Sequence, residues 1–236
     1  MIITSIASGS RGNCYHLRHG NTSLLIEAGV SPKSVNNRGI KLSDCSGLLI
    51  SHEHYDHSKY ASIISNQYDV TVYASKGTFD VIDGVNNNIP NKVVIKRFEA
   101  FSIGCFSILP FDVDHDANEP LGFVITTTDT FERLVFFTDT CRMRYLFSHV
   151  KYLMAECNYV NEILSNAVAI GSIGKRAASR IRYSHMGLDE LVDFIGELDK
   201  SELTAIYALH LSDRHSDEGL IKRTLQAAAG CAVYVC

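Results

Sequence analysis

A short run of metal-binding residue types follows an apolar segment at residues 48–50. The run reads Ser51-His52-Glu53-His54-Tyr55-Asp56-His57. In an extended segment, residues two positions apart point the same way, so His52 and His54 can share one metal ion. Asp56 and His57 then lie beyond, in a turn, where they can face a second metal. The spacing therefore predicts a metal site, with a solvated histidine-rich turn as the alternative.

Three more apolar segments end in a histidine or an aspartate. The segment ending near residue 113 is followed by Asp114-His115, the segment 135–137 by Thr138-Asp139, and the segment 206–209 by His210. Strand ends can converge on one rim of a fold, where loop residues are free to bind ligands. His115, Asp139 and His210 are therefore candidate partners of the histidine run.

These residues need a β-rich framework to bring them together. Short buried strands are expected at residues 23–28, 47–51, 70–74, 92–98, 106–115, 121–127, 133–138, 152–155 and 205–209. Apolar residues at helical spacing predict an amphipathic helix over 188–198, and a second helix is expected over 217–229, ending near Gly230. Strands with later helices predict a mixed α and β protein whose sheets are covered by helices.

Length and composition limit the remaining possibilities. The chain of 236 residues is 46% apolar and 20% charged, a globular profile that excludes whole-chain disorder. No linker or repeat divides it, so a single domain over residues 1–236 is expected. The net charge of −4 excludes a polycation built to wrap nucleic acid. No apolar run approaches the roughly 20 residues that span a bilayer, so no membrane partner is expected.

The cysteines indicate a compartment. All seven are scattered along the chain without a CxxC pair, which argues against a disulfide framework and for a reducing environment. The N-terminus shows no basic segment before an apolar one, so a secretory signal is not expected. We therefore expect a cytoplasmic protein, in the host cytoplasm if a phage encodes it.

The histidine run resembles the signature of the metallo-β-lactamase superfamily. The later histidines and aspartate follow in the order of that family's ligand motifs, and the resemblance covers nearly the whole chain. It implies an α/β (α+β) fold built as a four-layer αββα sandwich, with two metals at one edge. By position, the first metal would be bound by His52, His54 and His115 and the second by Asp56, His57 and His210, with Asp139 bridging both.

Flanking motifs select among the reactions of this superfamily. The segment Ser8-Gly9-Ser10-Arg11-Gly12-Asn13-Cys14 resembles the opening of the bacterial YycJ/WalJ branch, as does His115-Asp116-Ala117 with Pro120-Leu121-Gly122-Phe123. Four later segments resemble ribonuclease Z: Asp139-Thr140-Cys141-Arg142, Ala155-Glu156-Cys157, Ser184-His185-Met186-Gly187-Leu188-Asp189-Glu190 and Leu209-His210-Leu211-Ser212-Asp213-Arg214. Carried over from that family, Glu156 would orient His185, and His185 would help the leaving oxygen. Asp56 would join them in the catalytic set.

The chain also departs from these families. Where the superfamily usually has Asp-x-Gly after its second strand, this chain has Glu27-Ala28-Gly29, in which the longer acid can fill the same supporting role. It has no Gly/Pro-rich arm like the one with which ribonuclease Z holds tRNA, and no inserted RNA-processing domain. Both absences argue against a long RNA substrate.

The resemblance and the residue chemistry together predict a dinuclear metal-dependent phosphodiesterase, in which a metal-bound hydroxide attacks phosphorus. The histidine-rich ligand set favours zinc, and the carboxylates make manganese the alternative. The substrate is expected to be either a nucleic-acid end, as for an exonuclease, or a small cyclic nucleotide. Candidate phosphate contacts, with ordinary surface arginines as the alternative, are Arg11, Arg142 and Arg214.

Several alternative interpretations of the sequence stay open beside the phosphodiesterase hypothesis. A basic stretch between Glu162 and Asp189 can draw phosphate toward the site or simply form a solvated face; it contains Lys175, Arg176, Arg180 and Arg182. A thioester or lactone hydrolase would use the same metals without Glu156 and His185. A non-catalytic metal-binding module would hold metal without turnover. A homodimer is compatible with the sequence.

Overall fold

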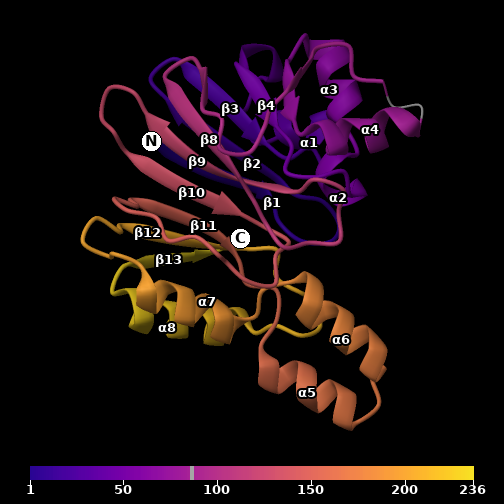
Figure 1. Cartoon of the computed structure of the whole chain (residues 1–236), viewed down its shortest axis with the longest axis vertical. Coiled ribbons are helices and arrows are strands. Elements are labelled where there is room, and N and C mark those ends of the chain that lie inside the picture. Colours follow the sequence, from indigo (N-terminus) through magenta and orange to yellow (C-terminus); the bar gives the residue numbers. More distant parts are fainter. Residues whose placement is uncertain (86–87) are drawn as a thin grey trace. The chain divides into compact units, whose positions relative to one another are not determined.

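The computed structural model describes residues 1–85 and 88–236, which group into two compact units (Figure 1). Unit 1 comprises Met1–Asp112 and Ala117–Glu132, and unit 2 comprises Val113–Asp116 and Arg133–Cys236. The expectation of a single domain over residues 1–236 stays a prediction.

Unit 1 is built on a six-stranded sheet with the order β1-β2-β3-β4-β5-β6. Its strands are β1 (Ile2–Ala7), β2 (Cys14–His19), β3 (Thr22–Ile26), β4 (Gly47–Leu49), β5 (Val72–Ala74) and β6 (Lys92–Val94). The pairs β1–β2 and β2–β3 are antiparallel, and β3 to β6 run parallel. Parallel strands end at the same edge, so the residues that follow β3 and β4 become neighbours.

One face of this sheet is covered by short helices: α1 (Pro32–Asn36), α2 (Tyr55–Ser58), α3 (Ala61–Tyr68), α4 (Lys76–Gly84) and the 3₁₀ turn η1 (Leu42–Asp44). Two of them begin at serine caps, because the Ser31 and Ser75 side chains accept hydrogen bonds from backbone N–H groups of the first turn. Ile64, Phe79 and Ile82 of the helices pack with the inward-facing strand residues in one buried cluster.

The other face of the sheet packs on an antiparallel meander of three strands, β7 (Phe101–Ile103), β8 (Phe106–Asp112) and β9 (Leu121–Thr127). The ring of Phe101 stacks on Tyr73 of β5 at 5.4 Å between centroids. A side chain at Gly47 would meet Ile103 at 3.1 Å, so glycine lets β4 and β7 approach closely. This packing buries β4 on both sides, which explains why the segment before the histidine run is entirely apolar.

Unit 2 contains the parallel strands β10 (Arg133–Phe137), β11 (Tyr152–Glu156), β12 (Ala205–Leu209) and β13 (Ala232–Val235). Two amphipathic helices, α7 (Leu188–Glu197) and α8 (Glu218–Ala229), lie along these strands (Figure 1). Phe194 of α7 meets Phe137 of β10 edge to face at 5.6 Å. The helices α5 (Asn161–Ala169) and α6 (Lys175–Ser184) form a hairpin beyond them.

All nine expected strands and both expected helices are confirmed, with ends that shift by up to four residues. The expectation that helices cluster late in the chain is wrong, since α1 to α4 all precede residue 85. These helices have four to nine residues, too few for apolar periodicity to show. The strands β1, β2, β7 and β13 were also missed, because polar residues interrupt them or they span only three or four residues.

Two further properties bear on the environment of the protein. Among the described residues, no helix combines the length and the apolarity that crossing a membrane requires. All seven cysteines are free thiols. Burial raises the pKa of the Cys14 and Cys157 thiols far above the ordinary value, and neighbouring carboxylates add to this effect. These two cysteines are therefore inert packing residues rather than nucleophiles.

Candidate metal centre

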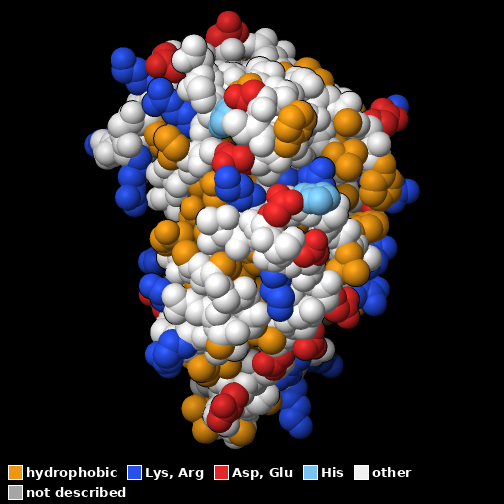
Figure 2. All heavy atoms as spheres, turned by 90° about the vertical axis from the view of Figure 1, so that its left-hand side faces the viewer, with side chains coloured by type: hydrophobic (Ala, Val, Ile, Leu, Met, Phe, Trp, Pro, Cys, Tyr) orange, Lys and Arg blue, Asp and Glu red, His pale blue; other side chains and the backbone are white. Residues whose placement is uncertain are grey.

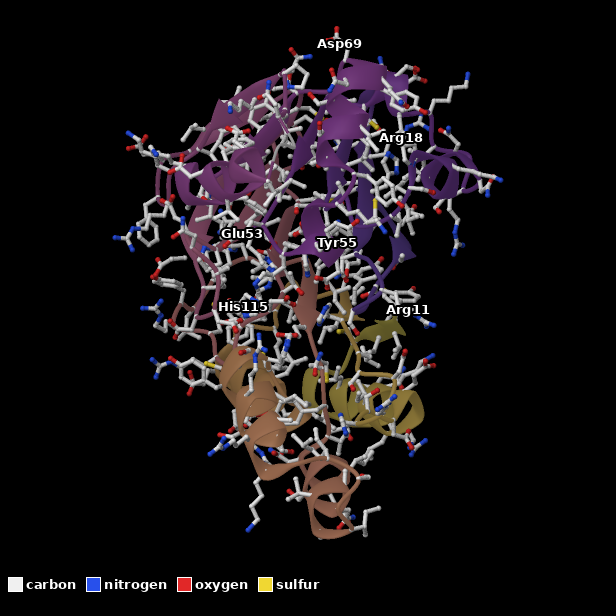
Figure 3. All side chains as sticks on the ribbon, turned by 90° about the vertical axis from the view of Figure 1, so that its right-hand side faces the viewer. Arg11, Arg18, Glu53, Tyr55, Asp69 and His115 are labelled. Carbon is white, nitrogen blue, oxygen red and sulfur yellow. The ribbon has the colours of Figure 1, made fainter. Side chains whose placement is uncertain are left out.

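In unit 1 the histidine run leaves the buried end of β4 and turns into α2. The His52 ring lies 4.6 Å from the His54 ring and 4.2 Å from the His57 ring, so three imidazoles share one small volume. Glu53 and Tyr55, labelled in Figure 3, alternate with them. The Glu53 carboxylate accepts a hydrogen bond from the Asn118 N–H (2.7 Å), so it anchors the segment before β9. The alternation of an extended segment thus separates ligand-type residues from anchoring ones.

A hydrogen bond from the first residue of the run fixes its first imidazole. His52 Nδ1 lies 2.9 Å from Ser51 Oγ, and His52 is 1% exposed. With Nδ1 engaged, Nε2 is the nitrogen that faces His54 and His57 as a metal ligand would.

Asn13 is a supporting residue whose role the sequence did not reveal. Its Nδ2 lies 3.2 Å from Asp56 Oδ2 and 3.1 Å from His57 Nε2. Its Oδ1 accepts hydrogen bonds from the Gly9 N–H (2.8 Å) and the Tyr15 hydroxyl (3.1 Å). The Ser8–Asn13 motif therefore folds so that the Asn13 amide contacts the side chains of Asp56 and His57 on α2. Only the presence of the motif, and not the role of its last residue, was visible in the sequence.

Glu27 supports the same helix from the end of β3. Its carboxylate is completely buried, accepts hydrogen bonds from the Ser51 N–H (3.3 and 3.4 Å) and lies 3.6 Å from His57 Nδ1. Its backbone has a φ of +66°, a left-handed conformation that is costly for a non-glycine residue. The strain turns the chain sharply at the strand end and places the acid beneath His57.

Gly29 lets three backbone segments meet under this cluster. A Cβ atom at residue 29 would lie 1.8 Å from the Asp56 carbonyl oxygen and 2.5 Å from the Asn13 nitrogen. Backbone hydrogen bonds join the same segments, from Asn13 N to Asp56 O (2.7 Å), from Gly29 N to Asn13 O (2.8 Å) and from Ala28 N to His57 O (2.6 Å). No residue with a side chain fits without displacing backbone atoms.

In unit 2 the carboxyl ends of three adjacent parallel strands bring together a second cluster. Asp139 follows β10, Glu156 ends β11, and His210 follows β12. Asp139 and His210 have φ angles of +50° and +54°, so both strands end in a sharp left-handed turn. One ligand atom from each member of the cluster lies within 4.8 Å of the others; the members are Asp139, Glu156, His185 and His210.

Glu156 is saturated with hydrogen bonds. Its Oε2 accepts from the backbone N–H groups of Thr140 (3.0 Å) and Met186 (3.1 Å). Its Oε1 accepts from Nδ1 of His185 (2.6 Å) and lies 3.2 Å from Nδ1 of His210. A fully buried carboxylate with these contacts can orient its neighbours, which leaves Asp139 as the carboxylate of this cluster that could hold a metal.

The pair Glu156–His185 is electrostatically coupled. Burial by itself raises the pKa of Glu156, but the charge and hydrogen bond of His185 outweigh it and lower this pKa below the ordinary value. Burial likewise lowers the pKa of His185, and the Glu156 carboxylate outweighs it and raises this pKa. The pair therefore favours a charged carboxylate beside a protonated imidazole, with Nδ1 facing Glu156.

His115 completes the cluster of unit 2. Its Nδ1 donates to the Ser184 carbonyl (3.0 Å), so Nε2 carries the lone pair. That Nε2 lies 3.6 Å from Asp139 Oδ2, a contact suited to two ligands of one cation. Each unit thus presents imidazoles and a carboxylate, and in each unit a hydrogen bond fixes Nδ1 of one imidazole, His52 or His115; this donor set fits a divalent metal ion.

The three candidate phosphate-binding arginines are all exposed. Arg142 donates through Nε to Asp114 Oδ2 (2.8 Å), and Arg144 lies 2.8 Å from the other oxygen of the same carboxylate. Arg142 is therefore bound to Asp114, the residue that precedes His115. Arg11 lies in the Ser8–Asn13 motif of unit 1, and Arg214 follows His210 in unit 2.

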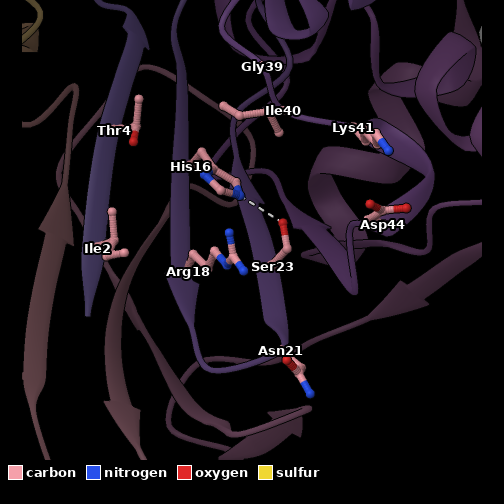
Figure 4. Close-up of a pocket in the computed structure, with 10 residues that line it drawn as sticks. All are labelled: Ile2, Thr4, His16, Arg18, Asn21, Ser23, Gly39, Ile40, Lys41 and Asp44. Carbon is pink, nitrogen blue, oxygen red and sulfur yellow. Dashed lines mark hydrogen bonds between the residues drawn. The ribbon is translucent and has the colours of Figure 1, made fainter.

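A cavity of about 470 Å³ lies elsewhere in unit 1, between strands β1 to β3 and the segment 39–44 (Figure 4). In it His16 lies 2.7 Å from Ser23 Oγ, and Arg18 and Lys41 line its wall. None of the predicted metal ligands lines this cavity.

Comparisons with known proteins show the family of the chain. Residues 22–211 match the family model described as a beta-lactamase superfamily domain. The exodeoxyribonuclease YycJ of Bacillus anthracis is 28% identical over 217 residues, which cover 88% of this chain and 81% of the relative.

Two solved structures share the fold. The metallo-beta-lactamase fold protein YhfI of Bacillus subtilis superposes with a TM-score of 0.73 at 14% identity, over 99% of this chain and 95% of the other. The short form of human tRNase Z superposes with a TM-score of 0.65 at 13% identity, over 99% and 95% of the two chains. The expected metallo-β-lactamase fold is confirmed. Since the family model spans most of the chain, including every segment that ends in a predicted ligand, the protein belongs to the beta-lactamase superfamily.

Proposed function

We propose that this protein is a dinuclear metal-dependent phosphodiesterase that hydrolyses nucleic-acid ends as an exonuclease. The observation that carries the proposal is the buried Glu156–His185 pair, joined at 2.6 Å beside Asp139 and His210. Hydrolysis of a phosphodiester expels an alkoxide, which benefits from a proton donor held in place. Hydrolysis of a β-lactam, a thioester or a lactone by the same fold needs no such pair.

The metal ligands are assigned in this proposal by the order of the family's motifs. The first metal would be held by His52, His54 and His115, the second by Asp56, His57 and His210, and Asp139 would bridge them. The hydrogen-bonded state of the imidazoles supports this assignment, because Ser51 and Ser184 engage Nδ1 of His52 and His115 and leave Nε2 to bind the metal. Histidine-rich ligation favours zinc over manganese.

The bound metals would activate a water molecule, bind a phosphoryl oxygen and stabilise the negative charge that develops during hydrolysis. The chain's own residues would do the rest. His185, held through Nδ1, would donate its Nε2 proton to the leaving oxygen, and Glu156 would keep the ring protonated and oriented. Arg142, fixed by Asp114, would contact a neighbouring phosphate.

A nucleic-acid end is favoured over a small cyclic nucleotide by the similarity to an exodeoxyribonuclease over 88% of the chain. The seven free thiols support action in a reducing compartment, as the cytoplasm provides. Both points are part of the proposal.

The test measures metal content and hydrolysis in the wild type and three variants. Bound metal is quantified by mass spectrometry, and turnover is followed with bis(p-nitrophenyl) phosphate, 5′-labelled DNA, RNA and a cyclic nucleotide. We expect two metals per chain, loss of metal and activity in His54→Ala, and, in His185→Ala, retained metal with about 10²–10⁴-fold slower cleavage of the DNA, whose leaving alkoxide needs the proton. His149→Ala is the control, because this exposed histidine pairs only with the surface residue Glu202 among the described residues.

Each outcome separates the alternatives. Unchanged cleavage of the DNA by His185→Ala would overturn the proposed mechanism and direct attention to thioesters and lactones. Two metals without turnover of any phosphodiester would support a metal-binding module instead. Cleavage of the cyclic nucleotide alone would contradict the assignment to nucleic-acid ends.

A further inference from the structure

The helix α6 of unit 2 exposes an unusually basic surface. Only Ala178 and Ser184 of its ten residues are buried, and Ile181 is half-buried; Ala178 and Ile181 pack on α5 around Tyr159 and Leu164. The other seven residues are exposed, and five of them carry a cation or a phenol: Lys175, Arg176, Arg180, Arg182 and Tyr183. A narrow apolar edge thus secures the helix and leaves most of its circumference to solvent. We call these five residues the α6 face.

No acid neutralises this surface from within the hairpin. Between residues 161 and 184 the single acidic residue is Glu162, against four basic ones, although the whole chain has a net charge of −4. Arg180 pairs with Asp116 (3.0 Å), and Arg182 bonds to the neutral Ser165 and Asn161 side chains. Within the part of the chain that the structure describes, Lys175 and Arg176 make no ion pair.

This distribution differs from an ordinary charged surface. On the side of the molecule shown in Figure 2, lysines and arginines are interspersed with aspartates and glutamates. On α6 the cations follow one another without an intervening acid, which concentrates a positive potential along the helix. Such a potential attracts a polyanion.

Tyr183 adds a flat apolar surface to these cations. It is 75% exposed and lies eight residues after Lys175, just over two helical turns along the helix and about 80° around its axis. Exposed aromatic rings among cations are how proteins bind single strands of nucleic acid, since every base can stack on a ring while the cations contact phosphates. A lone phosphate would need the cations but not the ring.

The helix also leads to the candidate metal centre. The last residue of α6 is Ser184, whose carbonyl accepts the hydrogen bond of His115, and His185 follows directly. Arg180 pairs with Asp116, the residue after His115. In Figure 3 the labelled His115 lies beside the orange ribbon of this region. A strand bound along α6 would therefore end at the residues proposed to cleave it.

We propose that the α6 face binds the sugar–phosphate backbone of a nucleic-acid strand, with Tyr183 stacking on a base. The inference deepens the proposed function, on which it rests for the chemistry of the substrate. A ten-residue helix is about 15 Å long, enough to follow about four stacked nucleotides. The substrate is then a strand of at least this length, and a mononucleotide does not reach the α6 face.

The experiment compares the double variant Lys175→Ser/Arg176→Ser and the single variant Tyr183→Ser with the wild type. Lys222→Ser/Arg223→Ser is the matched control, because this adjacent pair is also exposed on a helix, α8, of the same unit. Binding of a fluorescent 20-nucleotide DNA strand with uncleavable phosphorothioate links is measured by anisotropy between 50 and 200 mM salt. Turnover of bis(p-nitrophenyl) phosphate is measured in parallel, and circular dichroism checks folding.

We expect the Lys175→Ser/Arg176→Ser variant to raise Kd about tenfold and to reduce the slope of log K against log salt by about 1.4, the value for two lost phosphate contacts on a single strand. Tyr183→Ser should weaken binding with an unchanged slope. The α8 control and the turnover of the small substrate should stay within twofold of the wild type.

Unchanged strand binding in the α6 variants, or an equal loss in the α8 control, would overturn the inference. Sedimentation with phosphatidylserine vesicles is measured as well; if the α6 variants lose vesicle binding but keep strand binding, the inference is also overturned. The proposed function fails separately, through absent turnover of every phosphodiester. Because strand binding is measured without cleavage, the two failures can be distinguished.

Discussion

Replacing Glu156 with glutamine tests the hydrogen-bond network of unit 2 most directly. The carboxamide oxygen can keep the bonds from Thr140 N and Met186 N, which lie at 3.0 and 3.1 Å. Its NH₂ group then faces Nδ1 of His185 and of His210, the two positions at which the carboxylate is the acceptor. Two donors would oppose two donors, so both rings must rotate or change tautomer.

The size of the effect follows from these contacts. A hydrogen bond to a charged group contributes about 1.5–3 kcal/mol, and removal of a buried charge offsets part of the loss. We expect the free energy of unfolding to fall by about 3 kcal/mol, which lowers Tm by about 6–12 °C in a chain of this size. We expect kcat/KM for cleavage of a short labelled DNA strand to fall about 10²–10⁴-fold, because His185 is no longer held or kept protonated.

A double-mutant cycle decides whether Glu156 acts through His185. If it does, Glu156→Gln should lower kcat/KM less than threefold in a His185→Ala background. The exposed Glu162→Gln is the control for a loss of one negative charge. Full activity in Glu156→Gln, or independent effects of the two substitutions, would refute the reasoning.

Three other predictions concern unit 1. Asn13→Ala removes the amide that contacts Asp56 and should weaken metal affinity about 10–100-fold, as measured by competition with a chromophoric chelator; unchanged affinity would contradict a supporting role. Gly29→Ala should lower the free energy of unfolding by at least about 3 kcal/mol, as measured by urea unfolding, because its Cβ would collide with backbone atoms. Gly196→Ala on α7 is the control: its Cβ meets no atom within 4 Å, so it should be neutral or stabilising by up to about 1 kcal/mol. Burial, with Arg18 nearby, lowers the pKa of His16, so below about pH 6.5 the unfolded chain binds a proton that the folded chain does not bind. As the pH is lowered from 6.5, the free energy of unfolding should therefore fall more steeply in the wild type than in His16→Gln. Equal slopes would contradict this prediction.

Much of the framework could be predicted because its signals are local. Buried strands such as β9 and β12 appear as apolar runs, and the apolar face of α7 repeats at helical spacing. The segment 51–57 has its candidate metal ligands within seven consecutive residues, so its pattern is visible in the sequence. The helices α1 to α4 escaped prediction, since four to nine residues held by tertiary packing carry too little periodicity.

The sequence by itself determined which residues are candidates for the chemistry and that they follow strand ends. Only the tertiary structure decided which groups support them. Asn13 meets Asp56 across 43 positions, the Ser184 carbonyl meets His115 across 69, and Glu156 contacts four nitrogens from three separate segments. The spacing of residues along the chain predicts only which side chains are neighbours within one helix or one strand. These contacts depend instead on the path of the backbone between distant strands. The strained turns at Glu27, Asp139 and His210 follow from that path as well.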